Sequence, residues 1–271
     1  MSEKKTIGFI GLGNMASAMI GGMLRQKLVE PGNILGNAKT EKTRQRAQEE
    51  WGITILADNA AVARAADIVV LAVKPQFFEE VIGELKGLKE EAWQQKLLIS
   101  LAPGKSMAWF EERFGFPVPM IRCMPNTPAL VGEGCTGMCA SSAVPEELIS
   151  QVKRLTDSFG RTVMVPERLM DVVGAVSGSS PAFVFLFIEA LADGAVAEGM
   201  PRAQAYELAA QAVLGSARMV LETGKHPGEL KDMVCSPGGT TIQGIRTLEE
   251  RGFRAAAMDA VAACLEKSGK L

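Results

Sequence analysis

Short apolar runs alternate with helix-like segments through the first part of the chain. Residues 68–73 form a continuous apolar run, which is typical of a strand buried on both faces of a parallel sheet. Strands that alternate with helices in this way predict an α/β fold with a doubly wound parallel sheet. The expected strands are 6–10, 34–37, 52–55, 68–73, 97–100 and 120–123, and the expected helices are 14–26, 40–50, 59–65 and 76–85.

The pattern changes after about residue 165, where the strand-like runs end. The sequence therefore predicts two domains, residues 1–165 with the sheet and residues 166–271 built from helices alone. The expected helix 181–198 is apolar nearly all round, which predicts that it is buried. A dimer interface would bury it more easily than one small domain, so we expect a helical dimer. The expected helices of this domain are 181–198, 202–223, 228–234, 241–251 and 253–267.

The N-terminal apolar run could be mistaken for a signal peptide or a membrane helix. Lys4 and Lys5 precede it, and it extends over residues 7–24. Four glycines lie within residues 7–21, which makes the run a poor membrane helix. A strand, a tight turn and a helix explain it better, and we expect no membrane partner.

Composition narrows the class of protein further. The chain of 271 residues is 47% hydrophobic and 22% charged, as in an ordinary globular protein. A net charge of −2 and an aromatic content of 6% argue against nucleic acid as a partner. The five cysteines form no C-x-x-C pair, and His226 is the single histidine, so we expect no metal site. Reduced, buried cysteines indicate a cytoplasmic protein.

A glycine-rich loop lies between the first expected strand and the first expected helix. Its first glycine allows a tight turn, its second allows the backbone to approach a pyrophosphate, and its alanine allows close packing of helix on strand. The helix N-terminus would point its N–H groups at the phosphates. In this context the loop predicts a dinucleotide site, and the alternative is a plain glycine turn. The loop residues are Gly11, Leu12, Gly13, Asn14, Met15 and Ala16.

The end of the second expected strand bears on the cofactor. NAD sites usually have an acidic residue there for the ribose hydroxyls, whereas Asn37 is neutral. The cations and hydroxyls after Asn37 favour NADP, with its 2′-phosphate, over NAD. The alternative is a solvated helix N-terminus whose charge Glu41 partly cancels. The residues in question are Lys39, Thr40, Lys42 and Arg44.

Other candidate cofactor contacts lie at the carboxyl ends of later strands, where ligands bind to such sheets. Val73, Lys74 and Pro75 close the fourth strand, and Lys74 is either a contact of the nicotinamide ribose or an ordinary exposed lysine. Ala102 follows the next strand and would line the same edge. Asn59 either reaches the adenosine ribose or caps its own helix, and from sequence alone the cap is favoured.

A second glycine-rich loop, residues 236–241, has the features of an anion site. Pro237 stiffens it, two glycines expose backbone, and Thr240 and Thr241 offer hydroxyls at the start of a helix. A carboxylate would suit this helix N-terminus. However, Thr240 and Gln243 also form a capping box, which needs no ligand.

Three smaller signals complete the candidate chemistry. The two-proline loop 124–128 follows the strand 120–123 and should lie at the carboxyl edge of the sheet. Ser180 followed by Pro181 is a good N-cap and first-turn pair. His226 precedes a proline and is better interpreted as a turn residue than as a general base.

Four motifs together resemble the signature of pyrroline-5-carboxylate reductases, and the similarity runs over residues 7–267. The resemblance implies hydride transfer from NADPH, or alternatively NADH, to the imine of Δ1-pyrroline-5-carboxylate, giving L-proline. It also implies a Rossmann domain and a helical domain that dimerises through interlocking helices, with dimers often forming a decameric ring. The motifs are MPNTP at 124–128, SGSSPA at 177–182, HPG at 226–228 and LKDMVCSPGGTT at 230–241.

The same resemblance implies roles for individual residues. Thr241 would be the catalytic hydroxyl nearest the imine, and Glu167 would be an acid on the cofactor or substrate side. One departure is Pro103, where we expect a smaller residue, and this leaves the nicotinamide contacts there in doubt. The implied substrate contacts are Ser236, Gly239, Thr240, Thr241 and Glu167.

Two other functions compete with this one. The opening segment 8–15 also resembles β-hydroxyacid dehydrogenases, but those enzymes need a lysine that the region 177–198 lacks. A non-catalytic NADP-binding sensor would keep the first glycine loop and would need no substrate loop. Cofactor binding without turnover would favour the sensor.

Overall fold

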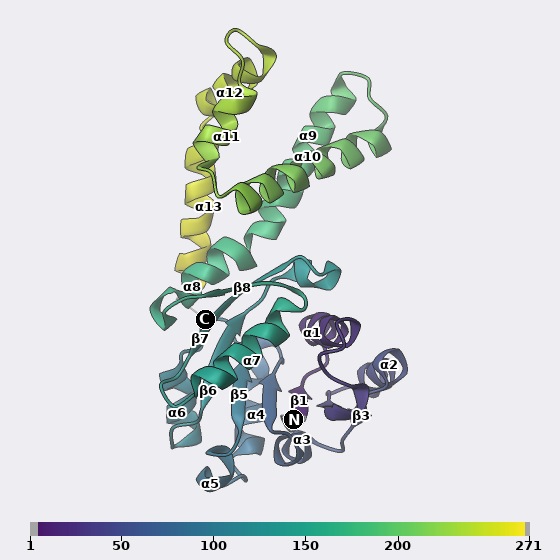
Figure 1. Ribbon diagram of the computed structural model, residues 1–271, viewed down its shortest axis with the longest axis vertical. Coiled ribbons are helices and arrows are strands. Elements are labelled where there is room, and N and C mark those ends of the chain that lie inside the picture. Colours follow the sequence, from purple (N-terminus) through teal and green to yellow (C-terminus); the bar gives the residue numbers. More distant parts are fainter. Residues whose placement is uncertain (1–4, 269–271) are drawn as a thin grey trace. The chain divides into compact units, whose positions relative to one another are not determined.

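The computed structural model describes residues 5–268 (Figure 1). Contacts between residues divide the chain into two compact units. The first runs to Gly178 and includes the last turn of the final helix from Leu265, and the second is Ser179–Cys264. The predicted domain limits of 165 and 166 stay a prediction.

In the described part of the chain, one sheet of eight strands forms the centre of the first unit (Figure 1). The strand order is β3-β2-β1-β4-β5-β6-β7-β8. Pairing is parallel from β3 to β6, β7 runs antiparallel to β6, and β8 is parallel to β7. The bounds are β1 Ile7–Ile10, β2 Ile34–Asn37, β3 Thr54–Ile55, β4 Ile68–Leu71, β5 Leu97–Ser100, β6 Met120–Met124, β7 Gly134–Ala140 and β8 Gly160–Met164.

Two apolar cores lie on opposite faces of this sheet. Side chains alternate between faces along a strand, and β4 follows this rule: Ile68 and Val70 join one core, whereas Val69 and Leu71 join the other. All four side chains are fully buried. The doubly wound arrangement is therefore confirmed. The first core is covered by α1 Asn14–Arg25, α2 Glu41–Trp51 and α7 Glu146–Asp157, and the second by α3 Asn59–Ala65, α4 Phe78–Leu85, α5 Glu90–Trp93 and α6 Met107–Phe114.

Several elements differ from the sequence prediction. The fourth strand ends at Leu71, two residues early, and the third shortens to Thr54–Ile55. The expected helix 76–85 begins as a 3-10 turn, η2 Pro75–Phe77. Strands β7 and β8 and helices α5, α6 and α7 were not predicted. Two further 3-10 turns are η1 Pro31–Asn33 and η3 Thr127–Val131.

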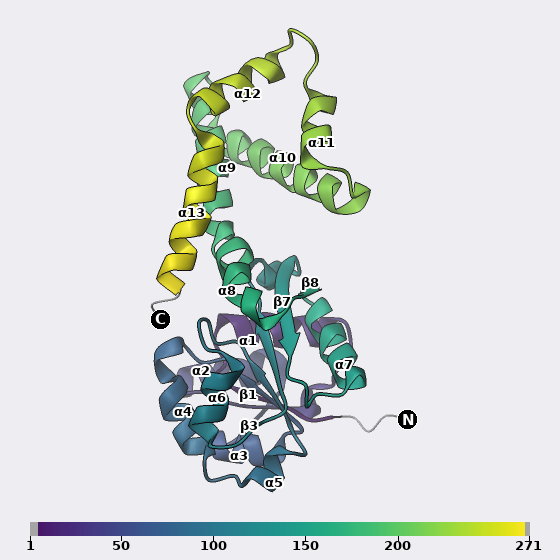
Figure 2. The ribbon, with the colours of Figure 1, turned by 90° about the vertical axis from the view of Figure 1, so that its left-hand side faces the viewer.

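The second unit is helical throughout its described residues, as predicted (Figure 2). A helical segment that was not predicted precedes it, comprising η4 Glu167–Leu169, α8 Met170–Val173 and the π-turn η5 Gly174–Gly178. The helices of the unit are α9 Ser180–Ala197, α10 Arg202–Thr223, α11 Pro227–Val234, α12 Thr240–Glu250 and α13 Phe253–Ser268.

The described residues of a single chain leave α9 exposed, so its predicted burial in a dimer stays a prediction. Ala192 is its one buried residue among those described, and the side chains of Phe185 and Leu186 are 61% and 66% exposed. The helical stretch Glu167–Ala197 is long and apolar enough to cross a membrane, by length and composition only. An apolar helix this exposed needs a covering surface, which residues 5–268 of one chain do not provide.

Candidate functional site

The first glycine of the N-terminal loop, Gly11, lies too close to the backbone of Ala72 for any larger residue. Gly11 has a φ of +96°, and a Cβ there would lie 2.7 Å from the carbonyl oxygen of Ala72. Its N–H donates to the carbonyl of Asn37 at 2.9 Å, so the loop is held between β2 and the end of β4. Any larger residue would push the loop away from both strands.

The second glycine leaves an open helix end. Gly13 is the N-cap of α1, and a Cβ there would meet nothing within 4 Å. Because glycine has no side chain, it cannot cap the first N–H groups of the helix. Those groups, together with the helix dipole, make this helix end suitable for an anion such as a phosphate.

The other loop residues divide between core and surface. Leu12 and Ala16 are buried, and the Leu12 side chain packs over Gly36, so these residues offer only backbone to a ligand. Met15 packs partly against the core, whereas Asn14 is exposed. The loop therefore has the strand–turn–helix setting that was predicted, and its contacts with a dinucleotide stay a prediction.

A cavity of about 270 Å³ opens beside the end of β2. It brings together five of the predicted cofactor contacts from separate parts of the chain. Sequence reasoning missed Phe77, Glu80 and Glu84, which come from η2 and α4 and also line it. The five predicted residues in its lining are Gly11, Asn37, Lys39, Asn59 and Val73.

Hydrogen bonds join three side chains that line this cavity, those of Asn37, Asn59 and Glu84. The Nδ2 of Asn37 donates to the Oδ1 of Asn59 at 3.0 Å, and the Nδ2 of Asn59 donates to Glu84 at 2.6 Å. The expectation that Asn59 caps its helix is wrong. Asp58 is the N-cap instead, since its Oδ1 accepts from the Ala61 N–H at 2.6 Å. The Asn59 side chain is thereby left to face the cavity.

The Oδ1 of Asn37 is the atom that fits a cofactor best. It is buried and has no hydrogen-bond partner among the described residues. An unpaired buried acceptor costs roughly 1–3 kcal/mol, which a ligand hydroxyl would recover by donating to it. A ribose hydroxyl is such a donor, so the residues present suit the adenosine end of a dinucleotide.

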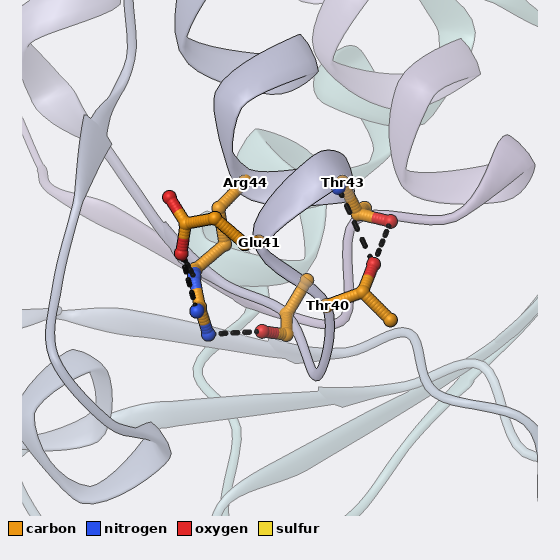
Figure 3. A network of polar contacts seen from close by, with 5 residues as sticks. Thr40, Glu41, Thr43 and Arg44 are labelled. Carbon is orange, nitrogen blue, oxygen red and sulfur yellow. Dashed lines mark hydrogen bonds and ion pairs between the residues drawn. The ribbon is translucent and has the colours of Figure 1, made fainter.

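The cations of this region come from the turn between β2 and α2. Lys39 is exposed, with its Nζ 4.5 Å from the centroid of the Phe77 ring. Arg44 donates hydrogen bonds to Glu41 and to the carbonyl of Ala38 (Figure 3). Two other residues were predicted to favour NADP. Thr40 caps α2, because its hydroxyl oxygen accepts from the Thr43 N–H at 3.3 Å, and the side chain of Lys42 is exposed.

The remaining cofactor candidates lie at the ends of β4 and β5. Val73 approaches Gly11 closely, whereas Lys74 is exposed and Pro75 begins η2. Ala102 is buried, and its N–H donates to Ser100 at 3.2 Å. Lys74, Pro75 and Ala102 do not line the β2 cavity in the described chain, so any contact they make would be with the far end of the cofactor.

In the second unit, the loop before α12 is a tight turn. The Gly239 N–H donates to the Ser236 carbonyl at 3.0 Å, and Gly238 has a φ of +69°. Proline at the second position and a left-handed glycine at the third fit a type II turn. The turn fixes the direction in which the chain enters the helix.

The predicted capping box is wrong. The N-cap of α12 is Gly239, and Thr240 is already the first helical residue. Since glycine cannot cap, the first-turn N–H groups stay available to an anion. Ser236, Thr240 and Thr241 are all exposed in the single chain. This geometry favours the anion-site interpretation, and the substrate contacts themselves stay a prediction.

Glu167 makes two contacts within the first unit. Its Oε1 accepts from the Nη1 of Arg122 at 2.9 Å and from the Met107 N–H at 2.7 Å. The Arg122 side chain is 5% exposed, so this carboxylate neutralises a buried charge. Sequence reasoning missed Arg122, which lies 45 positions away. The ion pair with Arg122 gives Glu167 a structural role. The predicted role of Glu167 beside the substrate stays a prediction.

Burial favours the protonated form of two cysteine thiols near this pair. Burial raises the pKa of the Cys139 thiol to about 11, although the nearby Arg122 charge opposes the change. Burial also raises the pKa of the Cys123 thiol, far above its ordinary value. All five cysteines are unpaired, and the described residues contain no cluster of three or more His, Cys, Asp or Glu that could hold a metal.

The structure tests two predictions about how the helices α9 and α11 begin. His226 caps α11, because its Nδ1 accepts from the Gly228 N–H at 3.0 Å, which confirms its role as a turn residue. Ser179, not Ser180, is the N-cap position of α9, so that prediction is wrong by one residue. The helix begins earlier because η5 leads directly into it.

Asn126 of the two-proline loop holds that helical segment. Its Nδ2 donates to the Ser177 carbonyl at 2.9 Å, and its Oδ1 accepts from the Cys135 N–H at 2.8 Å. In an α-helix the Ser177 carbonyl would accept from residue 181, but Pro181 has no N–H. Asn126 supplies the missing donor. The loop lies after β6, at the carboxyl edge of the sheet, as predicted.

Comparisons with known proteins agree with these features. A family model described as pyrroline-5-carboxylate reductase dimerisation matches residues 167–271, and one described as NADP oxidoreductase, coenzyme F420-dependent, matches residues 6–104. Pyrroline-5-carboxylate reductase of Escherichia coli strain K12 is 46% identical over 268 residues, 99% of this chain and 98% of the relative. The chain belongs to the pyrroline-5-carboxylate reductase family.

Other members of the family match over the same length. The enzyme of Methanosarcina acetivorans is 47% identical over 270 residues, 99% of this chain and 98% of the relative. A solved structure of Plasmodium falciparum pyrroline carboxylate reductase with NADP bound is 34% identical, with a TM-score of 0.86 over 99% of this chain and 98% of that chain. The Rossmann unit and the helical unit thus both fall within the family, rather than with the β-hydroxyacid dehydrogenases.

Replacing Asn126 by alanine should destabilise the protein by about 2–3 kcal/mol, because the change removes two partly buried hydrogen bonds. Thermal or urea unfolding measures this. Pro181→Ala restores an N–H at position 181, so Asn126→Ala should cost clearly less in that background. Equal costs in both backgrounds would show that Asn126 does not replace the amide lost at Pro181.

Replacing Glu167 by alanine should cost about 2–3 kcal/mol of unfolding free energy, since it leaves the buried Arg122 unpaired while Glu167 itself is partly exposed. Glu50→Ala, on the exposed end of α2, is the matched control and should change stability by less than about 0.5 kcal/mol. If both variants unfold like the original chain, the Arg122–Glu167 pair does not stabilise the first unit.

Proposed function

We propose that the chain reduces Δ1-pyrroline-5-carboxylate to L-proline with NADPH as the hydride donor, as the last step of proline synthesis. Its membership of the reductase family over nearly its full length carries this proposal. Two open helix N-termini, at Gly13 and Gly239, supply the anion sites that a dinucleotide and an amino acid need.

The first unit would hold the cofactor. The N-terminus of α1 would bind the pyrophosphate, and the β2 cavity would take the adenosine, with Asn37 accepting from a ribose hydroxyl. Lys39 and Arg44 favour a 2′-phosphate, and the Plasmodium relative has NADP bound. When bound, reduced NADP supplies a hydride from its nicotinamide ring.

The second unit would hold the substrate. The uncapped N–H groups of α12 would bind the substrate carboxylate, with Ser236 and Thr240 beside them. Thr241 would place its hydroxyl next to the imine nitrogen. A protonated imine already accepts hydride readily, so the protein need only fix its orientation, which alone contributes up to about 7–11 kcal/mol.

The chain would function as a homodimer formed through the helical unit. The family model for dimerisation matches residues 167–271, and α9 exposes an apolar surface that a second copy would cover. Dimers would assemble further into a decamer. A cytoplasmic location, without membrane or nucleic acid as partners, suits the composition and a soluble amino-acid substrate.

The direct test follows the absorbance of NADPH and of NADH in the presence of racemic Δ1-pyrroline-5-carboxylate. Oxidation with proline formed supports the reaction, and the ratio of the two rates gives the cofactor preference. Tight NADPH binding without any oxidation would instead favour a non-catalytic sensor.

Thr241→Ala should lower kcat/KM about tenfold to a hundredfold, the effect of losing one hydrogen bond of roughly 1.5–3 kcal/mol in the transition state. The variant should unfold like the original chain, because Thr241 is exposed. Thr247→Ala on the same helix is the control and should keep its activity. Unchanged turnover in Thr241→Ala would remove its proposed role.

Leu186→Glu should convert the protein towards monomers, because it places a charge within an apolar interface. Sedimentation or light scattering after size exclusion measures the mass. Val131→Glu is the control, since Val131 is 77% exposed and lies in the first unit. A monomeric original chain at micromolar concentration would contradict the proposed dimer.

A further inference from the structure

The guanidinium of Arg44, which lines the β2 cavity, forms an ion pair with the carboxylate of Glu41. Its Nε and Nη2 donate to the Oε2 of Glu41 at 3.0 and 2.5 Å, and its Nη1 donates to the Ala38 carbonyl at 2.8 Å. Figure 3 shows the Glu41 carboxylate and the Arg44 guanidinium side by side at the first turn of α2. The planar fork of the guanidinium, which suits a phosphate, thus faces an anion of the chain itself.

Three carboxylates line the cavity, those of Asp58, Glu80 and Glu84. Asp58 accepts from the Ala61 N–H and lies 3.9 Å from Arg64, and Glu84 accepts from Asn59. The acid that bonds Arg44, a cation of the cavity lining, is Glu41. It lies three residues before Arg44, on the same turn, so the two side chains meet without any change of backbone.

This ion pair is easily exchanged. The Glu41 side chain is 65% exposed and the Arg44 side chain 28% exposed, and exposed pairs of this kind contribute little to stability. A phosphate carries nearly two negative charges at neutral pH, so it is the stronger partner for the guanidinium. Two anions on one guanidinium also repel each other, and the carboxylate can turn away into water.

We propose that Glu41 sets the cofactor preference of the chain by competing with the 2′-phosphate of NADP for Arg44. The inference rests on the proposed function, because it requires the β2 cavity to take the adenosine end of the cofactor. Glu41 holds the guanidinium when no cofactor is bound, and its charge weakens the advantage of NADP over NAD. Removing that charge should strengthen binding of the 2′-phosphate and leave binding of the rest of the nucleotide unchanged.

The test measures binding of two small probes to the full chain by calorimetry, adenosine 2′,5′-bisphosphate and adenosine 5′-monophosphate. In Glu41→Gln, the bisphosphate should bind about threefold to tenfold more tightly, as expected when one exposed charge near a dianion is removed. The monophosphate should bind within about twofold of the original chain. Glu49→Gln, an equal charge change on the exposed far end of α2, should alter neither affinity.

A second background isolates the role of Arg44. In Arg44→Gln the preference for the bisphosphate should fall, and adding Glu41→Gln should then give less than half of the gain seen in the original background. The ratio of kcat/KM for NADPH and NADH should rise in Glu41→Gln by the same factor as the binding ratio. Circular dichroism checks that each variant keeps α2.

The outcomes separate this inference from the proposed function. If the original chain prefers the bisphosphate and Glu41→Gln leaves that affinity unchanged or weaker, Glu41 does not compete and the inference is overturned. If Glu49→Gln gives the same gain, the effect is one of net charge and the inference also fails. If the original chain binds neither probe, the adenosine site and the inference fail together.

Discussion

The close approach of two strand ends is the constraint on which the first unit depends. Strand β4 is buried on both faces, so its position is fixed, and the backbone that follows it comes within contact distance of Gly11. A glycine in the left-handed region is the residue that this approach allows. The turn at Gly11 then directs the chain into α1 and points the open end of that helix along the carboxyl edge of the sheet. The close packing at Gly11 therefore also determines where the N-terminus of α1 lies.

The same device recurs in the second unit. Side chains cap several helices of the chain, as Thr40 does for α2 and Asp58 for α3. Glycines precede α1 and α12, the two helices proposed to bind ligands, and no side chain caps their first N–H groups. Glycine in place of a capping side chain costs a helix only about a few tenths of a kcal/mol, so each glycine leaves N–H groups available to an anion at little cost in stability.

The sequence predicted the architecture well because strong local signals specify it. The apolar strand β4, the glycine loop and the long helix α10 all follow from period and turn chemistry. Caps were harder to place, since Asp58 and Asn59 are both good N-caps and only the tertiary position of Asn37 distinguishes them. Strands β7 and β8 escaped notice because their small and polar residues show no alternation. No local pattern could have joined Arg122 to a carboxylate 45 residues later.

The unpaired Oδ1 of Asn37 has a consequence for the life of the protein in a cell. Burying that atom alone weakens the unliganded chain, and a bound nucleotide stabilises it by mass action. The fraction of chains that unfold, and so are open to proteases, therefore falls as the nucleotide pool rises. In the proposed binding mode, the amide oxygen of Asn37 therefore contributes to the stabilisation of this protein by its nucleotide.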